Sequence, residues 1–385
     1  MTRSTPATGS QGQGLFRRLI VAAALVLAST GIVLAVVELI LRAVYLPEPW
    51  TTRNFTVDPV NRLVNYFPIQ YHPVLGYTGR ADYRGANMTQ GRMGVRLNHW
   101  LPADAPSPPL PSGGILAVGD SFTYGSEVAD AESWPAQLET MLGVPVVNAG
   151  AGGYGIDQAV LRAEQLIDIV KPSLIVVSFI PNCVGRNEYE INVGKAKPYF
   201  DIVDGKLVLR NVPVPTYRPA VAHVGLARAV FGYSYAVTWA AERLGWSDLW
   251  LVNRQEVRRA HTKGRDVGCL LWPRMAERLA GRGVSVIALA QYAGIHINGH
   301  DNLRAAAGVE HVLDCARKAG FTVVDSYGEL RRRYQSDESR FWNLWVRRPN
   351  DTKWHTGHMS AQGNRVTAEL LAEAIRRDMP NLLAR

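Results

Sequence analysis

Four positions in this sequence, three polar residues and one glycine, have the types and the surroundings that acyl transfer requires. Ser121 follows the apolar run 115–118, and a serine hydroxyl is a useful nucleophile only beside a general base. His358, shortly before the last predicted helix, is a candidate for that base. A tetrahedral intermediate also needs hydrogen-bond donors. Gly153 and Asn182 each follow a predicted strand and offer a backbone N–H and a side-chain amide.

The predicted secondary structure would bring these positions together. Strands are expected at 115–118, 144–148, 174–180, 284–290 and 322–325, with amphipathic helical patterns at 156–170, 309–316 and 366–375. Alternating strands and helices predict an α/β fold, a parallel sheet of about five strands covered by helices on both faces. Because ligands bind beyond the carboxyl ends of such strands, Ser121, Gly153 and Asn182 are expected at one edge of the sheet.

The order of the polar blocks resembles the SGNH (GDSL) hydrolase family. The blocks lie at 119–121, 148–155, 181–182 and 355–358, and the resemblance covers 113–185 and 284–378, about half of the chain. It implies a flavodoxin-like strand order, 2-1-3-4-5. It also implies that Ser121 is the nucleophile and His358 the base. The implied oxyanion donors are the N–H groups of Ser121 and Gly153 and the amide of Asn182.

The last block departs from the family's pattern, in which an Asp stands three residues before the His. Here His355 occupies that place, and Asp351 lies four residues before His355. The interval from His358 to Gly363 in the last helix favours His358 as the base. Asp351 is then a candidate third member through a bent loop, with a backbone carbonyl as the alternative. A shifted register, with Asp351 and His355 as the acid–base pair, stays open.

Other chemistries have weaker support in the sequence. Residues 150–155 match G-x-G-x-x-G, but the next strand ends without the carboxylate that a dinucleotide site requires. His355 and His358 have no apparent third metal ligand, so neither a metal nor a cofactor is expected. Cys183 follows Asn182 where related sequences commonly have Asp, and a catalytic thiol is not expected there.

The first 45 residues predict a membrane anchor. Arg17 and Arg18 precede an apolar stretch that is long enough to cross a bilayer, so 19–45 is predicted to span it and 1–18 to be cytoplasmic. A cleaved signal peptide is the alternative, although its apolar core would be only about 7–15 residues. Either reading places the rest of the chain outside the cytoplasm, on the periplasmic or extracellular face.

The remaining chain is expected to be one interrupted domain. Residues 46–112 are predicted to be an irregular lead-in segment with a proline-rich linker, followed by a hydrolase domain at 113–380. An insertion at 184–265 starts directly after Asn182, and we interpret it as a lid, with a packing elaboration as the alternative. Asp204-Gly205 predicts a hairpin within the insertion, and 220–245 a helix.

The amino-acid composition indicates which classes of binding partner to expect. The 385 residues are 47% hydrophobic and 19% charged, which is typical of a globular protein, and the net charge of +9 is not concentrated in a basic run with aromatic residues. No nucleic-acid partner is therefore expected, and the oligomeric state is left open. Cys269 and Cys315 each precede a strand on an amphipathic helix, and both a disulfide and buried free thiols are compatible with this.

The sequence therefore predicts a membrane-anchored, outward-facing serine esterase that hydrolyses O-acyl groups on an envelope carbohydrate. One alternative is a cell-envelope O-acyltransferase that forms the same acyl-enzyme and passes the group to a sugar. The other is a degenerate polysaccharide-binding module without catalysis.

Overall fold

The protein divides into two compact units, one made of residues 1–59 and 219–253, the other of 60–218 and 254–385. The computed structural model describes residues 10–45, 68–192, 195–215, 234–244, 256–258, 261–298, 308–348, 351, 354–355 and 357–382. Residues 1–9 and 46–67, and the part of the expected helix 220–245 outside 234–244, lie outside the described residues.

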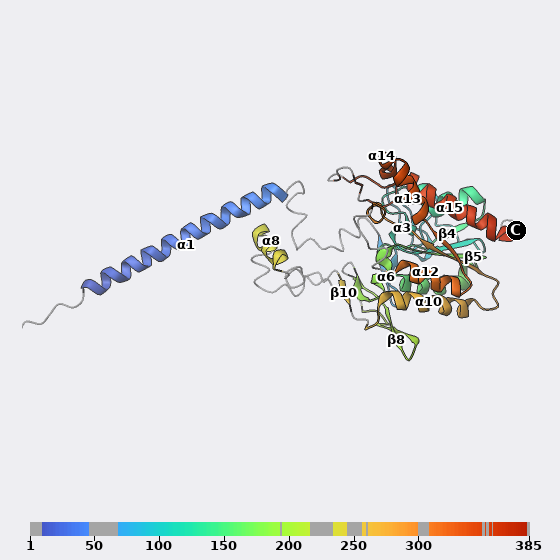
Figure 1. Cartoon of the computed structure of the whole chain (residues 1–385), viewed down its shortest axis with the longest axis horizontal. Coiled ribbons are helices and arrows are strands. Elements are labelled where there is room, and N and C mark those ends of the chain that lie inside the picture. Colours follow the sequence, from blue (N-terminus) through green and yellow to red (C-terminus); the bar gives the residue numbers. More distant parts are fainter. Residues whose placement is uncertain are drawn as a thin grey trace, which may run out of the picture. The chain divides into compact units, whose positions relative to one another are not determined.

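A five-stranded parallel sheet is the centre of the larger unit (Figure 1). Its strands are β3 (Ile115–Val118), β4 (Val146–Asn148), β5 (Leu174–Phe179), β11 (Ser285–Ala290) and β12 (Thr322–Asp325). They lie in the order β12-β11-β5-β3-β4, which is 2-1-3-4-5 when the strands are numbered along the chain. The expected fold class and strand order are confirmed, and each strand lies within one or two residues of its predicted bounds.

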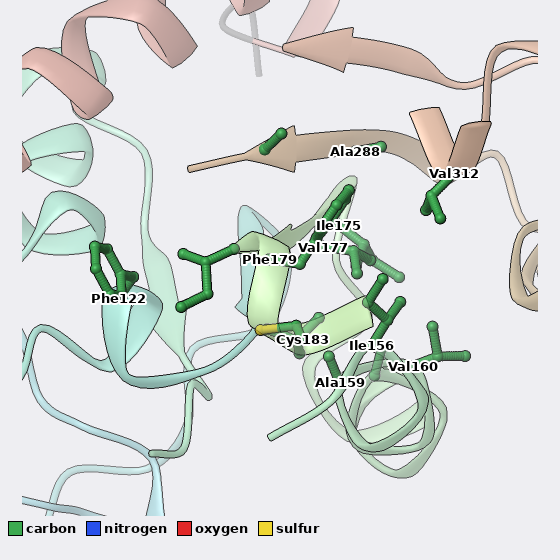
Figure 2. Close-up of a cluster of buried hydrophobic side chains, with 14 of the residues drawn as sticks. Phe122, Ile156, Ala159, Val160, Ile175, Val177, Phe179, Cys183, Ala288 and Val312 are labelled. Carbon is green, nitrogen blue, oxygen red and sulfur yellow. The ribbon is translucent and has the colours of Figure 1, made fainter. Parts of the chain in front are cut away.

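Helices cover both faces of this sheet because alternate strand residues point to opposite sides. Leu116 and Val118 belong to the core shared with α5 (Ile156–Val170), α10 (Gly264–Leu279) and α12 (Val309–Lys318), part of which Figure 2 shows. Ile115 and Ala117 face the other core, which contains residues of α4 (Trp134–Leu142) and α15 (Ala361–Asp378). Both strand faces are therefore apolar, as a doubly covered sheet requires.

Short elements connect these layers. The helices are α3 (Ser121–Tyr124), α6 (Pro181–Arg186), α13 (Tyr327–Ser336) and α14 (Glu338–Phe341), and the 3-10 turns are η1 (Arg92–Gly94), η2 (Asp130–Glu132), η4 (Gly294–His296), η5 (Trp342–Leu344) and η6 (Pro380–Leu382). Cys269 of α10 and Cys315 of α12 form a disulfide with a Cα–Cα distance of 5.1 Å. Of the two states that the sequence left open for these cysteines, the structure therefore contains the disulfide.

Residues 68–112 are part of the larger unit. They include the antiparallel pair β1 (Ile69–His72) and β2 (Gly76–Gly79). Leu75 is fully buried, and its carbonyl accepts a hydrogen bond from Gln158 Nε2 of α5 at 2.8 Å. Arg96 is also buried, at 2% exposure. The segment that looked irregular in the sequence therefore contributes to the core.

The insertion contains the predicted hairpin and a second small sheet. β8 (Tyr199–Val203) pairs with β9 (Lys206–Arg210) around Asp204-Gly205, as expected. A three-stranded antiparallel sheet has the order β10-β6-β7, formed by β10 (Glu256–Arg258), β6 (Tyr189–Asn192) and β7 (Lys195–Ala196). β6 and β7 follow α6 directly, so this part of the insertion lies close in sequence to Asn182.

The smaller unit contains the apolar N-terminal helix α1 (Ser10–Tyr45). Its segment Phe16–Leu41 has a mean hydropathy of 2.7 and is not buried against the protein, which suits a membrane span, although a signal sequence would have the same properties. Near the end of this segment, Glu38 Oε2 accepts hydrogen bonds from Ser234 Oγ at 2.8 Å and Ala236 N at 3.0 Å. Glu38 thereby caps the amino end of α8 (Tyr235–Arg243).

Candidate active site

Ser121 is the first residue of α3, directly beyond the carboxyl end of β3. Asp120 caps the helix by accepting a hydrogen bond from Phe122 N at 3.0 Å, so the turn between strand and helix has a fixed geometry. A Cβ on Gly119 would lie 2.5 Å from the carbonyl oxygen of Ser178 in β5. Glycine at this position therefore lets the two strand ends approach closely beside Ser121.

A chain of hydrogen bonds links Ser121 to His358 and to a carboxylate. Ser121 Oγ lies 2.9 Å from His358 Nε2, and His358 Nδ1 lies 2.7 Å from Glu127 Oε2. The backbone N–H of His358 also donates to Glu127 Oε2, at 2.6 Å. If the Nδ1 proton faces the carboxylate, the Nε2 lone pair faces the serine hydroxyl, as a general base requires.

The environment keeps Glu127 ionised. Burial alone would raise the pKa of its carboxyl, but hydrogen bonds from the side chain and backbone of His358 and from Arg348 outweigh it and lower the pKa to about 2. Arg348 Nε and Nη2 each lie 3.1 Å from Glu127 Oε1. A negative charge thus lies beside the imidazole of His358 at neutral pH.

The carboxylate beside His358 is Glu127 and not Asp351, which the sequence made the candidate third member. Asp351 Oδ2 accepts a hydrogen bond from the backbone N–H of Arg348 at 2.8 Å. Asp351 thus shapes the turn before the histidines, and none of its described contacts is with His358. The alternative register is also not formed, because His355 Nδ1 lies 3.1 Å from the carbonyl oxygen of Trp345.

Glu127 could not be identified from a motif. It lies six residues after Ser121 in the loop that follows α3, and it adopts φ +70°, which is uncommon for a residue other than glycine. Its acidic type, close to a candidate nucleophile, is the one signal in the sequence. Glu127 is identified as the carboxylate beside the base only by its contact with His358, which the folded loop around residue 358 brings to the end of β3.

The three expected oxyanion donors lie at the carboxyl ends of the adjacent strands β4, β3 and β5. The loop after β4 contacts the nucleophile turn directly, since Ala151 N donates to the carbonyl oxygen of Gly119 at 3.0 Å. Gly153 is half-buried with φ +82°, and the side chain of Asn182 is exposed in α6. Within the described part of the chain, none of the three donor groups has a hydrogen-bond acceptor.

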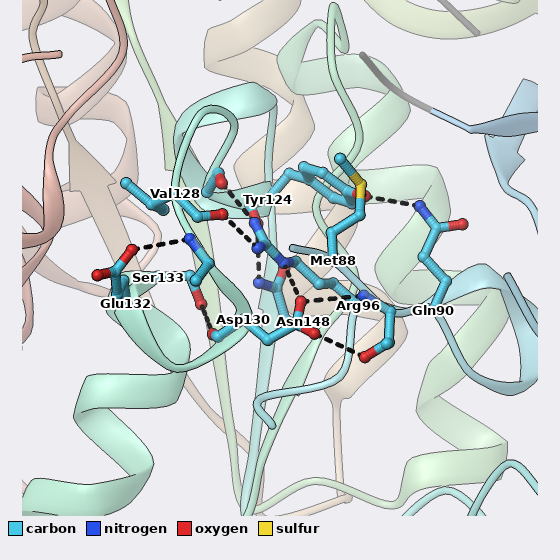
Figure 3. Close-up of polar contacts among 12 residues, drawn as sticks. Met88, Gln90, Arg96, Tyr124, Val128, Asp130, Glu132, Ser133 and Asn148 are labelled. Carbon is cyan, nitrogen blue, oxygen red and sulfur yellow. Dashed lines mark hydrogen bonds and ion pairs between the residues drawn. The ribbon is translucent and has the colours of Figure 1, made fainter. Parts of the chain in front are cut away.

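A buried arginine fixes the loop that carries Glu127 (Figure 3). Arg96 Nε lies 2.9 Å from Asp130 Oδ1, and its Nη1 and Nη2 donate to the carbonyl oxygens of Tyr124 at 2.8 Å and Val128 at 2.6 Å. Thr89 Oγ1 donates to the other oxygen of Asp130, at 2.7 Å. These contacts hold both ends of residues 124–130. No motif in the sequence distinguishes Arg96, which lies in the expected lead-in segment.

Cys183 is buried, and burial raises the pKa of its thiol well above the usual range. A thiol in that state is a poor nucleophile, which agrees with the expectation that it is not catalytic.

Comparisons with known proteins gave structural matches only. No family model and no curated protein sequence matches the chain. One similar solved structure is a protein from Desulfitobacterium hafniense DCB-2 assigned to the G-D-S-L lipolytic family (14% identity, covering 68% of this chain and 98% of that one, TM-score 0.36). Another is the lipase/acylhydrolase from Enterococcus faecalis (13% identity, 69% and 96% covered, TM-score 0.38).

A third similar structure is a catalytic mutant of an acetylxylan esterase from Geobacillus stearothermophilus (14% identity, 70% and 95% covered, TM-score 0.38). In its residue blocks, its strand order and the contact between Ser121 and His358, this chain is similar to the SGNH (GDSL) hydrolases.

Proposed function

We propose that this protein is a serine hydrolase of carboxylic esters. The observation that carries the proposal is the hydrogen-bonded chain from Ser121 through His358 to Glu127 at the carboxyl edge of the sheet. A surface histidine needs neither a serine on one ring nitrogen nor a charged carboxylate on the other. The two contacts together give the proton path that nucleophilic catalysis uses.

In the proposed reaction, Ser121 Oγ attacks the ester carbonyl carbon while His358 Nε2 takes the hydroxyl proton. The resulting oxyanion accepts hydrogen bonds from the N–H groups of Ser121 and Gly153 and from the amide of Asn182. When the tetrahedral intermediate collapses, the bond to the alcohol oxygen breaks and His358 returns the proton to that oxygen. Water then attacks the acyl-enzyme by the same steps, which releases the acid and regenerates Ser121.

We extend the proposal to location and substrate. The apolar helix α1 anchors the protein, with Arg17 and Arg18 on the cytoplasmic side and the hydrolase domain on the periplasmic or extracellular side. The substrates are O-acyl groups on an envelope carbohydrate, which such a location makes accessible. Protease added to intact spheroplasts should then degrade the C-terminal part, and protection of that part would contradict the topology.

The activity is tested with the full-length protein in detergent micelles. A fluorophosphonate should label Ser121, as shown by peptide mapping, and para-nitrophenyl acetate should be hydrolysed. Ser121→Ala should abolish both signals, whereas Ser336→Ala, which changes an exposed serine of α13, should retain them. Full activity of Ser121→Ala would refute the mechanism. Acyl transfer to an added sugar in preference to water would instead identify the O-acyltransferase.

A further inference from the structure

The charged side chains near the loop of residues 152–154 are not all paired with an opposite charge. Asp120 pairs with Arg186 at 3.1 Å, and Asp157 pairs with Lys197 at 2.6 Å. Lys195 is a third cation in this region, and within the described part of the chain no carboxylate lies within ion-pair distance of it. Lys195 therefore has no counter-ion among the described residues, and neither has the buried Arg162, although Arg162 donates hydrogen bonds to Gln165 and to the carbonyl oxygen of Met93.

The side chain of Lys195 is almost completely enclosed, with 5% exposure. Its Nζ lies 4.5 Å from the centroid of the Tyr77 ring, a cation–π contact. No hydrogen-bond acceptor for this ammonium lies among the described residues. The ammonium of Lys197, by contrast, has four hydrogen-bond acceptors, since Lys197 Nζ donates to Asp157 and to three backbone carbonyls at 2.6–3.2 Å.

Two independent contacts place Lys195 beside the loop of Gly152 and Gly153. Lys195 pairs with Asn192 in the β6–β7 register, so both side chains lie on the same face of that sheet. Asn192 Nδ2 donates to the carbonyl oxygen of Gly153. Tyr77, whose ring makes the cation–π contact with Lys195, donates its hydroxyl proton to the carbonyl oxygen of Gly152 at 2.8 Å.

Asn192 has an unused acceptor at the same place. The residue is 1% exposed, and its Oδ1 is buried without a hydrogen-bond partner among the described residues. Most buried polar atoms in folded proteins are paired, because an unpaired one costs free energy. A donor and an acceptor that both lack partners, on one face of the same sheet, indicate a built site for a polar ligand.

We propose that Lys195 and Asn192 form a subsite beside the oxyanion loop that binds an anionic group of the ester substrate. The ammonium of Lys195 pairs with a carboxylate or similar anionic oxygen group, and Asn192 Oδ1 accepts a hydrogen bond from a neighbouring hydroxyl. The inference rests on the proposed hydrolysis and adds the substrate class, an acidic hydroxylated ester.

The free energy of the unliganded site favours such a ligand. A charge on a largely enclosed side chain is incompletely solvated, and the low dielectric environment around it strengthens its attraction to an anion that arrives. Burial lowers the pKa of Lys195 to about 8, so the side chain is still mostly protonated near neutral pH. The substrate would supply the counter-ion that the described chain lacks.

Two matched pairs of esters test the proposal and locate the anion, with full-length protein in detergent. Para-acetoxybenzoate and para-acetoxybenzamide differ in charge on the alcohol side, and para-nitrophenyl hemisuccinate and para-nitrophenyl butyrate differ on the acyl side. In one pair, we expect kcat/KM for the anionic ester to exceed that for the neutral ester by about 10- to 100-fold, the range of a charged hydrogen bond.

Variants then assign that preference to one residue. Lys195→Met and Lys195→Gln should bring the ratio of anionic to neutral kcat/KM near one, and Lys195→Arg should retain most of it. Lys206→Met, which removes an exposed lysine of β9, should leave the ratio as in the wild type. The absence of a preference in both wild-type pairs, or an equal loss on both esters in the Lys195 variants, would overturn the proposal.

Failure of the proposed hydrolysis would be recognised separately, by the absence of Ser121-dependent turnover of the neutral esters. In that case calorimetric binding of para-hydroxybenzoate and succinate, compared with their neutral amides, still tests the subsite. Binding that is selective for the anion and lost in Lys195→Met supports the subsite. Equal or absent binding of the charged and neutral compounds overturns it.

Discussion

Replacing Glu127 with glutamine tests the reasoning about the site most directly. The substitution keeps the shape of the side chain and removes its charge, and the structure dictates how the new amide must turn. Glu127 Oε2 accepts two hydrogen bonds from His358, at 2.7 Å from Nδ1 and 2.6 Å from the backbone N–H. Because a backbone N–H is always a donor, the amide oxygen should occupy that position, with its NH₂ group facing Arg348.

This orientation predicts a moderate loss of activity. Arg348 is 45% exposed, so its side chain can turn into solvent and avoid the NH₂ group. His358 would keep its proton on Nδ1 and lose only the charge that stabilises its imidazolium form. Hydrogen bonds to a charged acceptor exceed neutral ones by about 1–2 kcal/mol, so kcat for Glu127→Gln should fall by about 5- to 30-fold.

Glu127→Ala should be more damaging because it also removes the acceptor that fixes the tautomer. Loss of the correct tautomer lowers kcat by about 10⁴-fold in a well-studied serine protease, so we expect a loss of about 10²- to 10⁴-fold here. The assay is kcat with para-nitrophenyl acetate for the full-length protein, and circular dichroism checks folding. Asp351→Asn is the matched control and should change kcat little, since Asp351 contacts Arg348 N.

Three outcomes would refute this reasoning. If Glu127→Gln were as inactive as Ser121→Ala, the amide would have turned its NH₂ group towards His358. Wild-type kcat in Glu127→Ala would show that Glu127 does not orient the base. A large loss in Asp351→Asn would return the role of third member to Asp351.

The remaining predictions concern the base, the loop anchor, the disulfide and pH. His358→Ala should abolish turnover, and its combination with Ser121→Ala should be hardly worse. His355→Ala should cost about 10-fold at most, because the hydrogen bond of His355 among the described residues is with the carbonyl oxygen of Trp345 and not with the nucleophile. The reverse order of kcat values would restore the alternative register. Arg96→Met should leave the carboxylate of Asp130 buried without its ion-pair partner and lower the free energy of unfolding by about 3–5 kcal/mol, measured by urea denaturation. A fall in kcat should accompany this loss, and an unchanged urea midpoint would contradict the anchoring role of Arg96. Reducing the Cys269–Cys315 disulfide, which closes a separation of 46 residues, should lower the free energy of unfolding by about 2–4 kcal/mol in the same assay without altering kcat while the protein stays folded. The pKa of Glu127 is lowered to about 2 in the folded state, compared with about 4.3 for an unfolded glutamate. The ionised carboxylate should therefore stabilise the fold above a pH of about 4.3 and lose this effect as the pH falls towards 2. The melting temperatures of the wild type and Glu127→Gln should accordingly converge near pH 2.

The sequence by itself determined the central sheet and the candidate nucleophile. A buried parallel strand must be apolar on both faces, so 115–118 and 174–177 stand out as short apolar runs without any knowledge of their neighbours. The hairpin at Asp204-Gly205 was predictable for a similar reason, because its turn chemistry involves only adjacent residues. Ser121 was recognisable because it follows the strand at 115–118, and His358 because of its interval to Gly363 in the last helix.

The tertiary structure alone decided which groups complete the site. Glu127 and His358 are 231 residues apart, and Arg96 lies 34 residues from Asp130, so no local pattern records either contact. The pairing of Cys269 with Cys315 likewise depends on how α10 packs against α12. Lys195 looks like an ordinary strand lysine until the packing of β7 against Tyr77 encloses its side chain, with no counter-ion among the described residues. Local periodicity encodes the elements, whereas burial, charge pairing and hydrogen bonds across loops exist only once distant elements meet.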